Sequence, residues 1–335
     1  MPKILVIRFS SIGDIVLTTP VFRCLKNQLP GAEVHFVTKG SYSIVTATNP
    51  YIDRFFYLGD DLNEVIEKLK KENYDYVIDL HNNLRSLRIK RALKKKSFSV
   101  AKLNVEKFLL SNLNINVMPD AHITKRSLDT VAELSVVDDG AGLDYFIPDN
   151  DKVKESDIPT SHSAGFISIV IGATYETKKM PLHKLQELCY KLDHPVMLLG
   201  GGEDFEDGEK IRSVDPVKIY NACGKFNLNE SADLVRRSKL VITHDTGLMH
   251  IAAALQKPII SIWGNTTPLF GMYPYYGSRS SKQYDVVEVK LRCRPCSKIG
   301  YHKCPLEHFK CMENHDIDAL LILINTKLKT IPAHQ

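Results

Sequence analysis

Short apolar runs alternate with helical patterns along the whole chain, and they fall into two series. In the first half of the chain, the runs predict strands near Lys3–Ile7, Glu33–Thr38, Arg54–Leu58, Tyr76–Leu80 and Phe98–Ala101. The second series predicts strands near Gly165–Ile171, Pro195–Leu199, Lys218–Asn221, Lys239–Thr243, Pro258–Ile262 and Asp285–Val289. Near-continuous apolar strands that alternate with helices are typical of parallel sheets covered on both faces. The pattern therefore predicts an α/β protein with two Rossmann-like domains that face each other.

The stretch 133–165 separates the two series with a cluster of turn-forming and charged residues. Such clusters mark domain boundaries. We therefore expect an N-terminal domain over residues 1–155 and a C-terminal domain over residues 156–335. The last helical stretch, Ile317–Lys329, is a candidate to pack back on the first domain.

Four polar loops follow predicted strands directly. They are SSIGD after the first strand, GATYETKKMP after Ile171, GGGED after Leu199 and HDTGLMH after Thr243. In parallel α/β folds, ligands bind beyond the carboxyl ends of the strands. We therefore expect the functional residues of this chain in these loops.

The loop HDTGLMH leads from a strand into a helix, which starts at Asp245, Thr246 and Gly247. The first backbone N–H groups of a helix have no partner within it and form an anion site, suited here to a diphosphate. His250 lies on the same helical face as Thr246. The alternative is a simple helix cap made by Asp245 or Thr246.

The loop GATYETKKMP contains a hydroxyl group at Thr174 and two positive charges at Lys178 and Lys179. A lysine beside an anion site can neutralise a phosphate as it leaves. The alternative is a solvated lysine pair with no ligand.

Two further loops contain carboxylates. In GGGED, Gly200–Gly202 allow close backbone approach, and Asp204 either accepts hydrogen bonds from a ribose or begins a helix. In SSIGD, Asp14 follows the first strand, where it either acts on a ligand or caps the next helix.

Composition and charge narrow the class of protein. With 44% hydrophobic and 25% charged residues the chain is an ordinary globular protein. No apolar run approaches the ~20 residues that span a bilayer, and the first residues do not form a signal peptide, so a cytoplasmic location is expected.

The segment Arg85–Lys96 holds seven cations and no anion. It predicts either a solvated helix face or attraction to phosphates or an anionic membrane surface. Aromatic residues are not interleaved with it, which argues against nucleic acid.

Several well-known site motifs are absent. No G-x-G-x-x-G follows the first strand, and neither G-x-x-x-x-G-K-[ST] nor G-x-S-x-G occurs. These absences argue against a nicotinamide dehydrogenase, a P-loop ATPase and an α/β-hydrolase.

Two longer segments together resemble one family. KILVIRFSSIGDIVLTTPVFRCL is similar to the start of the bacterial heptosyltransferases (glycosyltransferase family 9), where a strand leads into S-S-x-G-D and a helix with T-x-P. KLVITHDTGLMHIAAALQKPIISIWGNTTP is similar to the donor segment of that family, with D-[ST]-G-x-x-H, A-A-A-L and G-x-T-x-P. Each match is weak alone, but both occur in the expected order.

The resemblance implies a GT-B fold, an ADP-heptose donor and an anionic lipopolysaccharide inner-core acceptor. It also implies inversion at the anomeric carbon without a metal or another cofactor. Asp14 matches the general base of the family, and Lys178 matches the lysine that meets the donor phosphates. Met180 stands where many members have tryptophan, so Lys179 is the alternative.

The remaining site residues follow the same resemblance. The implied donor-binding residues are Thr174, Lys178, Asp204, Asp245, Thr246, Gly247 and His250. The implied acceptor-binding residues are Ser11, Gly13, Arg85 and Arg126. Peripheral contact with the inner membrane surface is compatible with this acceptor and with the basic segment.

Four of the seven cysteines cluster in CRPCSKIGYHKCPLEHFKC. They are Cys293, Cys296, Cys304 and Cys311. C-x-x-C followed by two more cysteines is compatible with structural zinc. Reduced or oxidisable thiols are the other interpretation, and the spacing leaves both open.

Three alternative functions remain. A glycosyltransferase of the same fold with another nucleotide sugar fits the same loops. A nucleotide-sugar epimerase shares the architecture but turns over without an acceptor. A two-lobed solute-binding protein would bind a free sugar without affinity for ADP.

Overall fold

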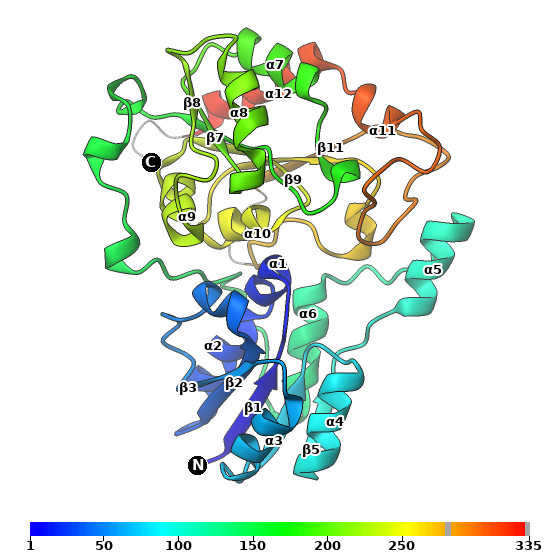
Figure 1. The fold of residues 1–335 in the computed structure, drawn as a ribbon. Coiled ribbons are helices and arrows are strands. Elements are labelled where there is room, and N and C mark those ends of the chain that lie inside the picture. Colours follow the sequence, from blue (N-terminus) through cyan, green and yellow to red (C-terminus); the bar gives the residue numbers. More distant parts are fainter. Residues whose placement is uncertain (279–282, 332–335) are drawn as a thin grey trace. The chain divides into compact units, whose positions relative to one another are not determined.

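The computed structural model describes residues 1–278 and 283–331 and divides into two compact units (Figure 1). Unit 1 comprises Met1–Leu103, Asp120–Phe146 and Tyr275–Ser281. Unit 2 comprises Asn104–Pro119, Ile147–Pro274 and Lys282–Gln335. The chain therefore passes between the units more than once, and the main division after Phe146 lies before the boundary expected at residue 155.

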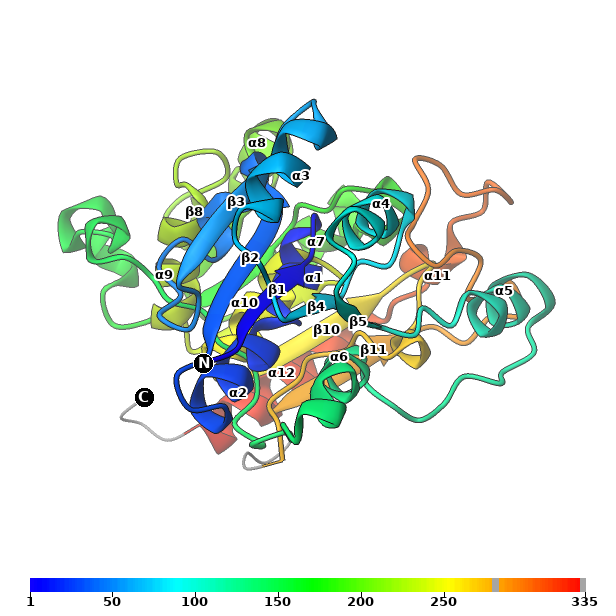
Figure 2. The same ribbon diagram turned by 90° about the horizontal axis from the view of Figure 1, so that it is seen from below.

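Unit 1 is built on a parallel sheet with the strand order β3-β2-β1-β4-β5 among its described residues. The strands are β1 (Lys3–Ile7), β2 (Glu33–Lys39), β3 (Arg54–Leu58), β4 (Tyr76–Asp79) and β5 (Lys96–Ser99). Figure 2 shows β1 with β2 on one side and β4 on the other. β1 and β2 are buried almost throughout, as expected of strands covered on both faces.

The helices of unit 1 differ in how much of their surface they bury. They are α1 (Ile12–Val16), α2 (Thr19–Gln28), α3 (Leu62–Lys70), α4 (Leu84–Leu93) and α6 (Ile123–Leu128). In α3 the buried residues are Leu62, Val65, Ile66 and Leu69, which recur at helical spacing, and the Asp61 side chain caps the first turn. These apolar side chains join the core around β1.

Unit 2 is built on a parallel sheet with the strand order β11-β10-β9-β6-β7-β8 among its described residues. The strands are β6 (Ile167–Val170), β7 (Val196–Leu199), β8 (Ile219–Asn221), β9 (Leu240–His244), β10 (Ile259–Trp263) and β11 (Tyr284–Glu288). β6, β7, β9 and β10 are buried at every position. Both predicted series of strands are thus present as two parallel sheets.

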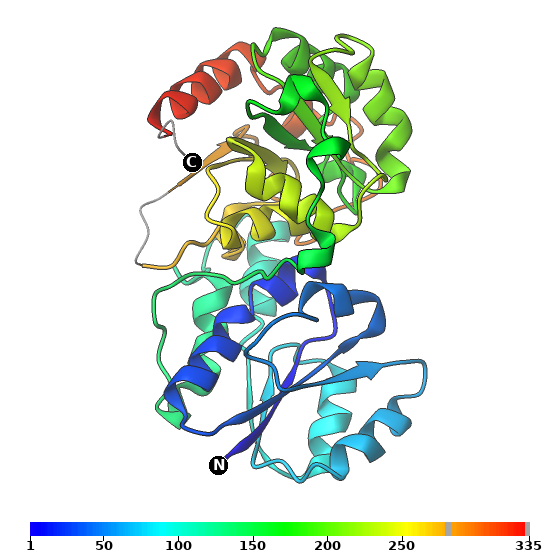
Figure 3. The same cartoon turned by 90° about the vertical axis from the view of Figure 1, so that its left-hand side faces the viewer.

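Unit 2 contains seven described α-helices, of which α5 buries only Leu110. They are α5 (Asn104–Leu113), α7 (Leu182–Lys191), α8 (Phe205–Arg212), α9 (Leu228–Arg237), α10 (Gly247–Ala254), α11 (Lys310–Glu313) and α12 (Ile317–Thr330). α12, red in Figure 3, packs against α7 and contributes Leu320 and Ile324 to the core of unit 2. Among the described helices, none combines the length and the apolar character that crossing a bilayer requires.

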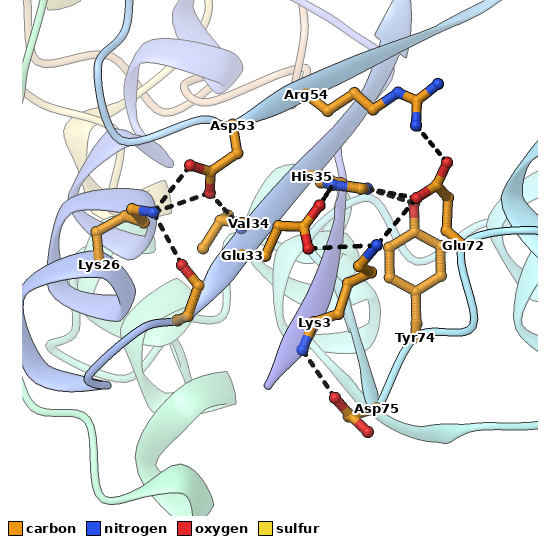
Figure 4. A network of polar contacts seen from close by, with 11 residues as sticks. Lys3, Lys26, Glu33, Val34, His35, Asp53, Arg54, Glu72, Tyr74 and Asp75 are labelled. Atoms are coloured by element: carbon orange, nitrogen blue, oxygen red, sulfur yellow. Dashed lines mark hydrogen bonds and ion pairs between the residues drawn. The ribbon is translucent and has the colours of Figure 1, made fainter. Parts of the chain in front are cut away.

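A charged network stabilises the amino-terminal edge of the unit 1 sheet (Figure 4). His35 is fully buried, and its ring nitrogens lie 2.7 Å from Oε1 of Glu33 and 2.9 Å from the hydroxyl of Tyr74. Lys3 pairs with Glu33 and with Glu72 at 3.2 and 3.1 Å. Lys3 and Arg54 therefore balance the charge of these carboxylates, but Glu33 stays 46% exposed, so its pair with Lys3 contributes modestly to stability.

The strand orders place a topological switch point in each sheet. In unit 1 the order reverses between β1 and β4, and in unit 2 it reverses between β6 and β9. At a switch point the loops after the two neighbouring strands diverge to opposite faces and leave room for a ligand at the carboxyl edge. The loops after β1, β4, β6 and β9 are therefore the first places to examine.

Candidate functional site

At the switch point of unit 2, Lys178 and Asp245 bring together the loops after β6 and β9. Nζ of Lys178 lies 2.7 Å from Oδ2 of Asp245 and 3.2 Å from its carbonyl oxygen. The hydroxyl of Thr266, in the loop after β10, donates to the same Oδ2 over 3.1 Å. One carboxylate thus joins three loops at the carboxyl edge of the sheet.

The helix α10 begins directly after Asp245. Thr246 is its extended N-cap residue, and Gly247 is the first helical residue. The first N–H groups of this helix have no intrahelical acceptor, and the helix dipole places partial positive charge at this end. Together with the Lys178 ammonium, the helix end has the electrostatics of a diphosphate site.

The loop that contains Lys178 is fixed from behind by His244, the last residue of β9. The Met180 backbone N–H donates to Nε2 of His244 over 3.0 Å. Burial lowers the pKa of His244 to about 3, and the charges of His315 and Lys179 act in the same direction. His244 is therefore neutral at physiological pH and acts as a hydrogen-bond acceptor.

The two lysines of this loop have different partners. Lys178 pairs with Asp245, whereas Nζ of Lys179 lies 3.1 Å from Oδ1 of Asp204 and 2.9 Å from Glu176. Asp204 is buried, and its Oδ2 accepts the N–H of Gly201 over 2.9 Å. Of the two lysines, Lys178 therefore lies beside the N-terminus of α10. Asp204 pairs with Lys179 and accepts a hydrogen bond within its own loop.

The other expected donor residues differ in exposure. Thr174 is exposed in the loop after β6. His250 is buried one turn into α10. The structure thus brings Lys178, Asp245, Thr246 and Gly247 together, with Thr174 in the same loop as Lys178 and His250 in the same helix as Gly247.

At the switch point of unit 1, Asp14 lies in the short helix α1 after β1. Its Oδ1 is 2.7 Å from Nη2 of Arg8, and its Oδ2 accepts from the backbone N–H and the hydroxyl of Ser11 over 3.2 and 3.0 Å. Arg8 also donates to the carbonyl oxygen of Leu80, directly after β4, over 2.6 Å. Arg8 therefore connects the two loops of this switch point.

The ionisation of Asp14 follows from these contacts. Burial by itself raises the pKa of the carboxyl, but the Arg8 guanidinium and the hydrogen bonds from Ser11 outweigh it. The pKa therefore lies below the ordinary value of 3.8. About a quarter of the side chain, 24%, stays exposed. Asp14 is thus ionised and accessible at neutral pH, and it also caps its helix.

Arg85 lines an open pocket of about 620 Å³ at the carboxyl ends of β2 and β3. Lys39 and Arg88 add two further cations to its wall, and Asp60 and Asp61 add two carboxylates. Arg85 is exposed and projects from the first turn of α4. The pocket therefore suits a ligand with both anionic and hydroxyl groups.

The remaining acceptor candidates differ in their surroundings. Ser11 is the exposed N-cap residue of α1, and Gly13 is buried within that helix. Arg126, in α6, is 6% exposed, and its Nη1 donates to the carbonyl oxygen of Ala101 over 3.3 Å. Arg126 therefore supports a loop of unit 1 and lies largely below the surface.

Arg8 and His244 complete the two sites, although the sequence pattern assigned no role to either. Arg8 directly follows β1, and His244 is the last residue of β9. A polar side chain at the carboxyl end of a buried strand is a usable signal. Their partners, Leu80 and Met180, are 72 and 64 residues away, so the contacts are not visible in sequence.

Comparison with known proteins identifies the family. Residues 62–306 match glycosyltransferase family 9 (heptosyltransferase). The chain is 27% identical over 293 residues to lipooligosaccharide heptosyltransferase 2 of Haemophilus influenzae, covering 80% of this chain and 85% of the relative. The structure is similar to the glycosyl transferase family 9 protein from Veillonella parvula, with a TM-score of 0.78, 20% identity and coverage of 98% and 97%.

A second solved structure has the same fold. The Escherichia coli ADP-heptose lps heptosyltransferase II is 19% identical, with a TM-score of 0.73 and coverage of 98% of both chains. These likenesses confirm the predicted α/β fold of the GT-B class, with two Rossmann-like parallel sheets. The family match spans most of the chain, and the protein therefore belongs to glycosyltransferase family 9, the heptosyltransferases.

Proposed function

We propose that this protein is an inverting heptosyltransferase that moves heptose from ADP-heptose to an anionic acceptor in the lipopolysaccharide inner core. One observation carries the proposal: Lys178 and Asp245 lie together at the switch point of unit 2, beside the N-terminus of α10. The names of the relatives support the substrates, because they print lipooligosaccharide heptosyltransferase and ADP-heptose lps heptosyltransferase.

In this proposal unit 2 binds the donor. The diphosphate takes the N–H groups of α10 and the Lys178 ammonium, while Asp245 and Thr266 hold that ammonium in place. Negative charge grows on the diphosphate as the bond to the sugar breaks. The helix dipole and Lys178 stabilise this charge, which lowers the barrier. Thr174, Asp204 and His250 are proposed to complete the donor site.

In this proposal unit 1 binds the acceptor and provides the general base, Asp14. The acceptor hydroxyl oxygen forms the new bond to the anomeric carbon, its proton passes to Asp14, and ADP leaves with the electrons of the broken bond. The sugar carbon is oxocarbenium-like in this transition state. A positioned general base contributes about 10²–10⁴-fold. Asp14 fits the role because it is ionised and accessible at neutral pH.

The acceptor is proposed to use the cationic pocket of unit 1 at Arg85, with Ser11, Gly13 and Arg126 in supporting positions. Peripheral contact with an anionic membrane surface belongs to the same proposal, because the acceptor is part of a lipid. The cationic run Arg85–Lys96 supports this contact, and so do the exposed apolar side chains of Val105, Phe108 and Leu113 on α5.

The test is a transfer assay with ADP-heptose and a heptose-free inner-core acceptor, with ADP release and product mass as readouts. Asp14→Asn keeps an oxygen that can accept from Ser11 but removes the charge. We expect turnover to fall by about 10²–10⁴-fold, with ADP affinity close to that of the wild type and a modestly lower melting temperature, because the ion pair with Arg8 is lost. Retained turnover in this variant would exclude Asp14 as the base.

A donor-only control separates the alternatives. An epimerase would change ADP-heptose without acceptor, and a transferase of another sugar would prefer a different nucleotide sugar in the same assay. Product formed only when both substrates are present supports the heptosyl transfer.

A further inference from the structure

Four cysteines of unit 2 line one small cavity. The cavity has a volume of about 30 Å³, and Cys293, Cys296, Cys304, Cys311 and His308 contribute to its wall. All four cysteines are free thiols; Cys311 is buried and the others are half-buried. A cavity of this volume has room for a single small occupant. The spacing C-x2-C-x7-C-x6-C thus gathers the ligand type of tetrahedral thiolate metal sites.

The hydrogen bonds of His308 show what its ring does in this cluster. The backbone N–H of Lys310 donates to Nδ1 over 3.0 Å, so in the neutral ring the proton is on Nε2. Nε2 lies 3.8 Å from Sγ of Cys293. His308 is therefore placed to donate toward the sulfur, which is the role of a group that stabilises a metal-bound thiolate.

We propose that Cys293, Cys296, Cys304 and Cys311 bind one tetrahedral metal ion of the thiolate-preferring class, zinc or iron. His308 donates to the Cys293 thiolate and is not itself a ligand. Tetrahedral sites with four sulfur ligands are typical of these metals. Each thiol releases its proton on binding, and no redox step is involved.

The other candidate metal cluster in the described residues is less suitable. In that cluster the ligand atoms of Glu33, His35 and Glu72 all lie within 4.8 Å of one another. No three sulfur atoms of the four cysteines lie within that distance of one another. However, Lys3 and Arg54 already pair with these carboxylates (Figure 4). Metal–sulfur bonds of about 2.3 Å would draw the cysteine sulfurs inward into the cavity.

The cysteine segment is attached to both donor loops of unit 2. Between the first two cysteines, Arg294 donates to the carbonyl oxygens of Gly264 and Thr266. Between Cys296 and Cys304, the N–H of Tyr301 donates to the hydroxyl of Thr177 over 2.8 Å. The N–H of Thr177 donates back to the carbonyl oxygen of Tyr301 over 3.1 Å.

The metal ion would therefore fix the position of Lys178 and Thr266, which are the two groups that hold Asp245. This functional consequence rests on the proposed donor site, whereas the metal site itself does not. The two inferences are accordingly measured by separate experiments.

The first experiment measures the metal content of the full-length protein by mass spectrometry, after purification without chelators and without metal-affinity resin. We expect one zinc or iron ion per chain, and the element found distinguishes the two metals. Cys304→Ser should lose the ion, whereas Cys24→Ala, which removes a buried thiol of unit 1, should keep it. His308→Ala should keep the ion but bind it about 10–100-fold more weakly.

A second measurement is independent of whether Cys304→Ser folds. Wild-type protein is stripped of metal with a mercurial and refilled with Co²⁺, which absorbs strongly in the visible range when four thiolates surround it. Metal near background in the wild type, together with no such absorption, overturns the metal site. ADP binding that is unchanged after metal removal overturns the role in the donor loops. A metal-loaded protein that does not bind ADP contradicts the proposed function instead.

Discussion

At the scale of the residue, the two aspartates of the proposed sites are held by cations of different character. Asp14 pairs with Arg8, whose guanidinium is also bonded to the carbonyl oxygens of Ser10 and Leu80. Asp245 pairs with Lys178 and accepts from Thr266. Arginine stays charged and keeps a fixed geometry, whereas lysine is a point charge on a flexible stem. Arg8 therefore sets the ionisation of Asp14, while Lys178 can move from Asp245 to a phosphate.

The neighbouring lysines Lys178 and Lys179 allow a matched pair of variants. Lys178→Met should raise the donor KM and lower kcat together, because in the proposed mechanism the ammonium binds the diphosphate and stabilises the charge that grows on it. Lys179→Met, which loses the pairs to Asp204 and Glu176, should mainly lower the melting temperature. Steady-state kinetics with ADP-heptose distinguish the two. Unchanged kinetics in Lys178→Met would move the phosphate contact to Lys179.

Arg8 predicts a pH effect whose sign follows from the pKa of Asp14. In the wild type this pKa lies below 3.8, so kcat/KM should fall only when the pH drops below that value. In Arg8→Met the burial of Asp14 remains and the Arg8 charge is lost, so the pKa rises and the acidic limb moves to higher pH. The lowered pKa also stabilises the fold above pH 3.8. This contribution is lost as the pH falls below 3.8 and through the pKa that Asp14 has in the folded protein.

The pH–rate profile of both proteins measures this shift. Lys70→Gln removes a cation of α3 that pairs with Glu67 on the surface, and it should leave the limb where it is. An acidic limb that stays in place in Arg8→Met would mean that Asp14 is not the titrating base.

At the scale of the element, α4 shows how one helix distributes its cations among different tasks. Arg85 and Arg88 line the pocket at the ends of β2 and β3. Lys90 pairs with the buried Asp79 over 2.9 Å. Arg91 is exposed and is not part of the pocket wall. The charge run of the sequence therefore contains three kinds of position, of which only one lines the pocket.

Arg85→Gln and Arg91→Gln remove the same charge from the same helix. If the pocket binds the acceptor, Arg85→Gln should raise the acceptor KM about 10-fold or more, which corresponds to the ~1.5–3 kcal/mol of a charged hydrogen bond, and leave ADP affinity unchanged. Arg91→Gln should have little effect on either constant. Equal effects of both variants would favour diffuse attraction to an anionic surface over a specific pocket.

The elements differ in how well the sequence predicts them. The predicted strand Arg54–Leu58 agrees with β3, because a short run rich in aromatic residues between turn residues is typical of a strand, even at the edge of a sheet. β5 begins at Lys96, ahead of the expected Phe98. The cause is Lys94, which ends α4 in the left-handed conformation with φ of 53°, a position usually taken by glycine. A lysine gives no such signal in a sequence.

The sites were predictable to a similar extent. The loops and the residues Asp14, Lys178 and Asp245 follow from their place after buried strands and from the family resemblance. Their roles remain predictions. The contacts that hold them, such as Arg8 with Leu80 and Thr177 with Tyr301, join positions far apart in the chain. Local patterns do not encode such pairs.

At the scale of the whole molecule, a late segment of the chain completes unit 1. The described residues 275–278 belong to this unit, although residues 147–274 and 283–331 belong to unit 2. The Tyr275 hydroxyl donates to Asp138 over 3.0 Å, and its ring stacks on His122 with a centroid distance of 4.6 Å. The domains expected at 1–155 and 156–335 would separate this segment from its partners.

Gly277 tests the importance of this segment for stability. Its φ is +77°, and a Cβ there would lie 2.3 Å from the carbonyl oxygen of Gly140. Gly277→Ala should therefore destabilise the protein by about 1–3 kcal/mol. Gly59→Ala is the control, because nothing lies within 4 Å of its added Cβ. Thermal unfolding compares the two, and equal melting temperatures would mean that the segment adjusts freely.

The switch point of unit 2 has a consequence for the protein during its synthesis. Lys178 follows β6 and Asp245 follows β9, 67 residues later. A nascent chain that has left the ribosome only as far as β8 thus lacks both the aspartate and the helix end. If the donor site is as proposed, nucleotide binding can begin only after β9 has been added beside β6. Binding of ADP-heptose would therefore indicate that β9 has paired with β6 at the centre of the sheet. Incomplete chains would not bind the donor.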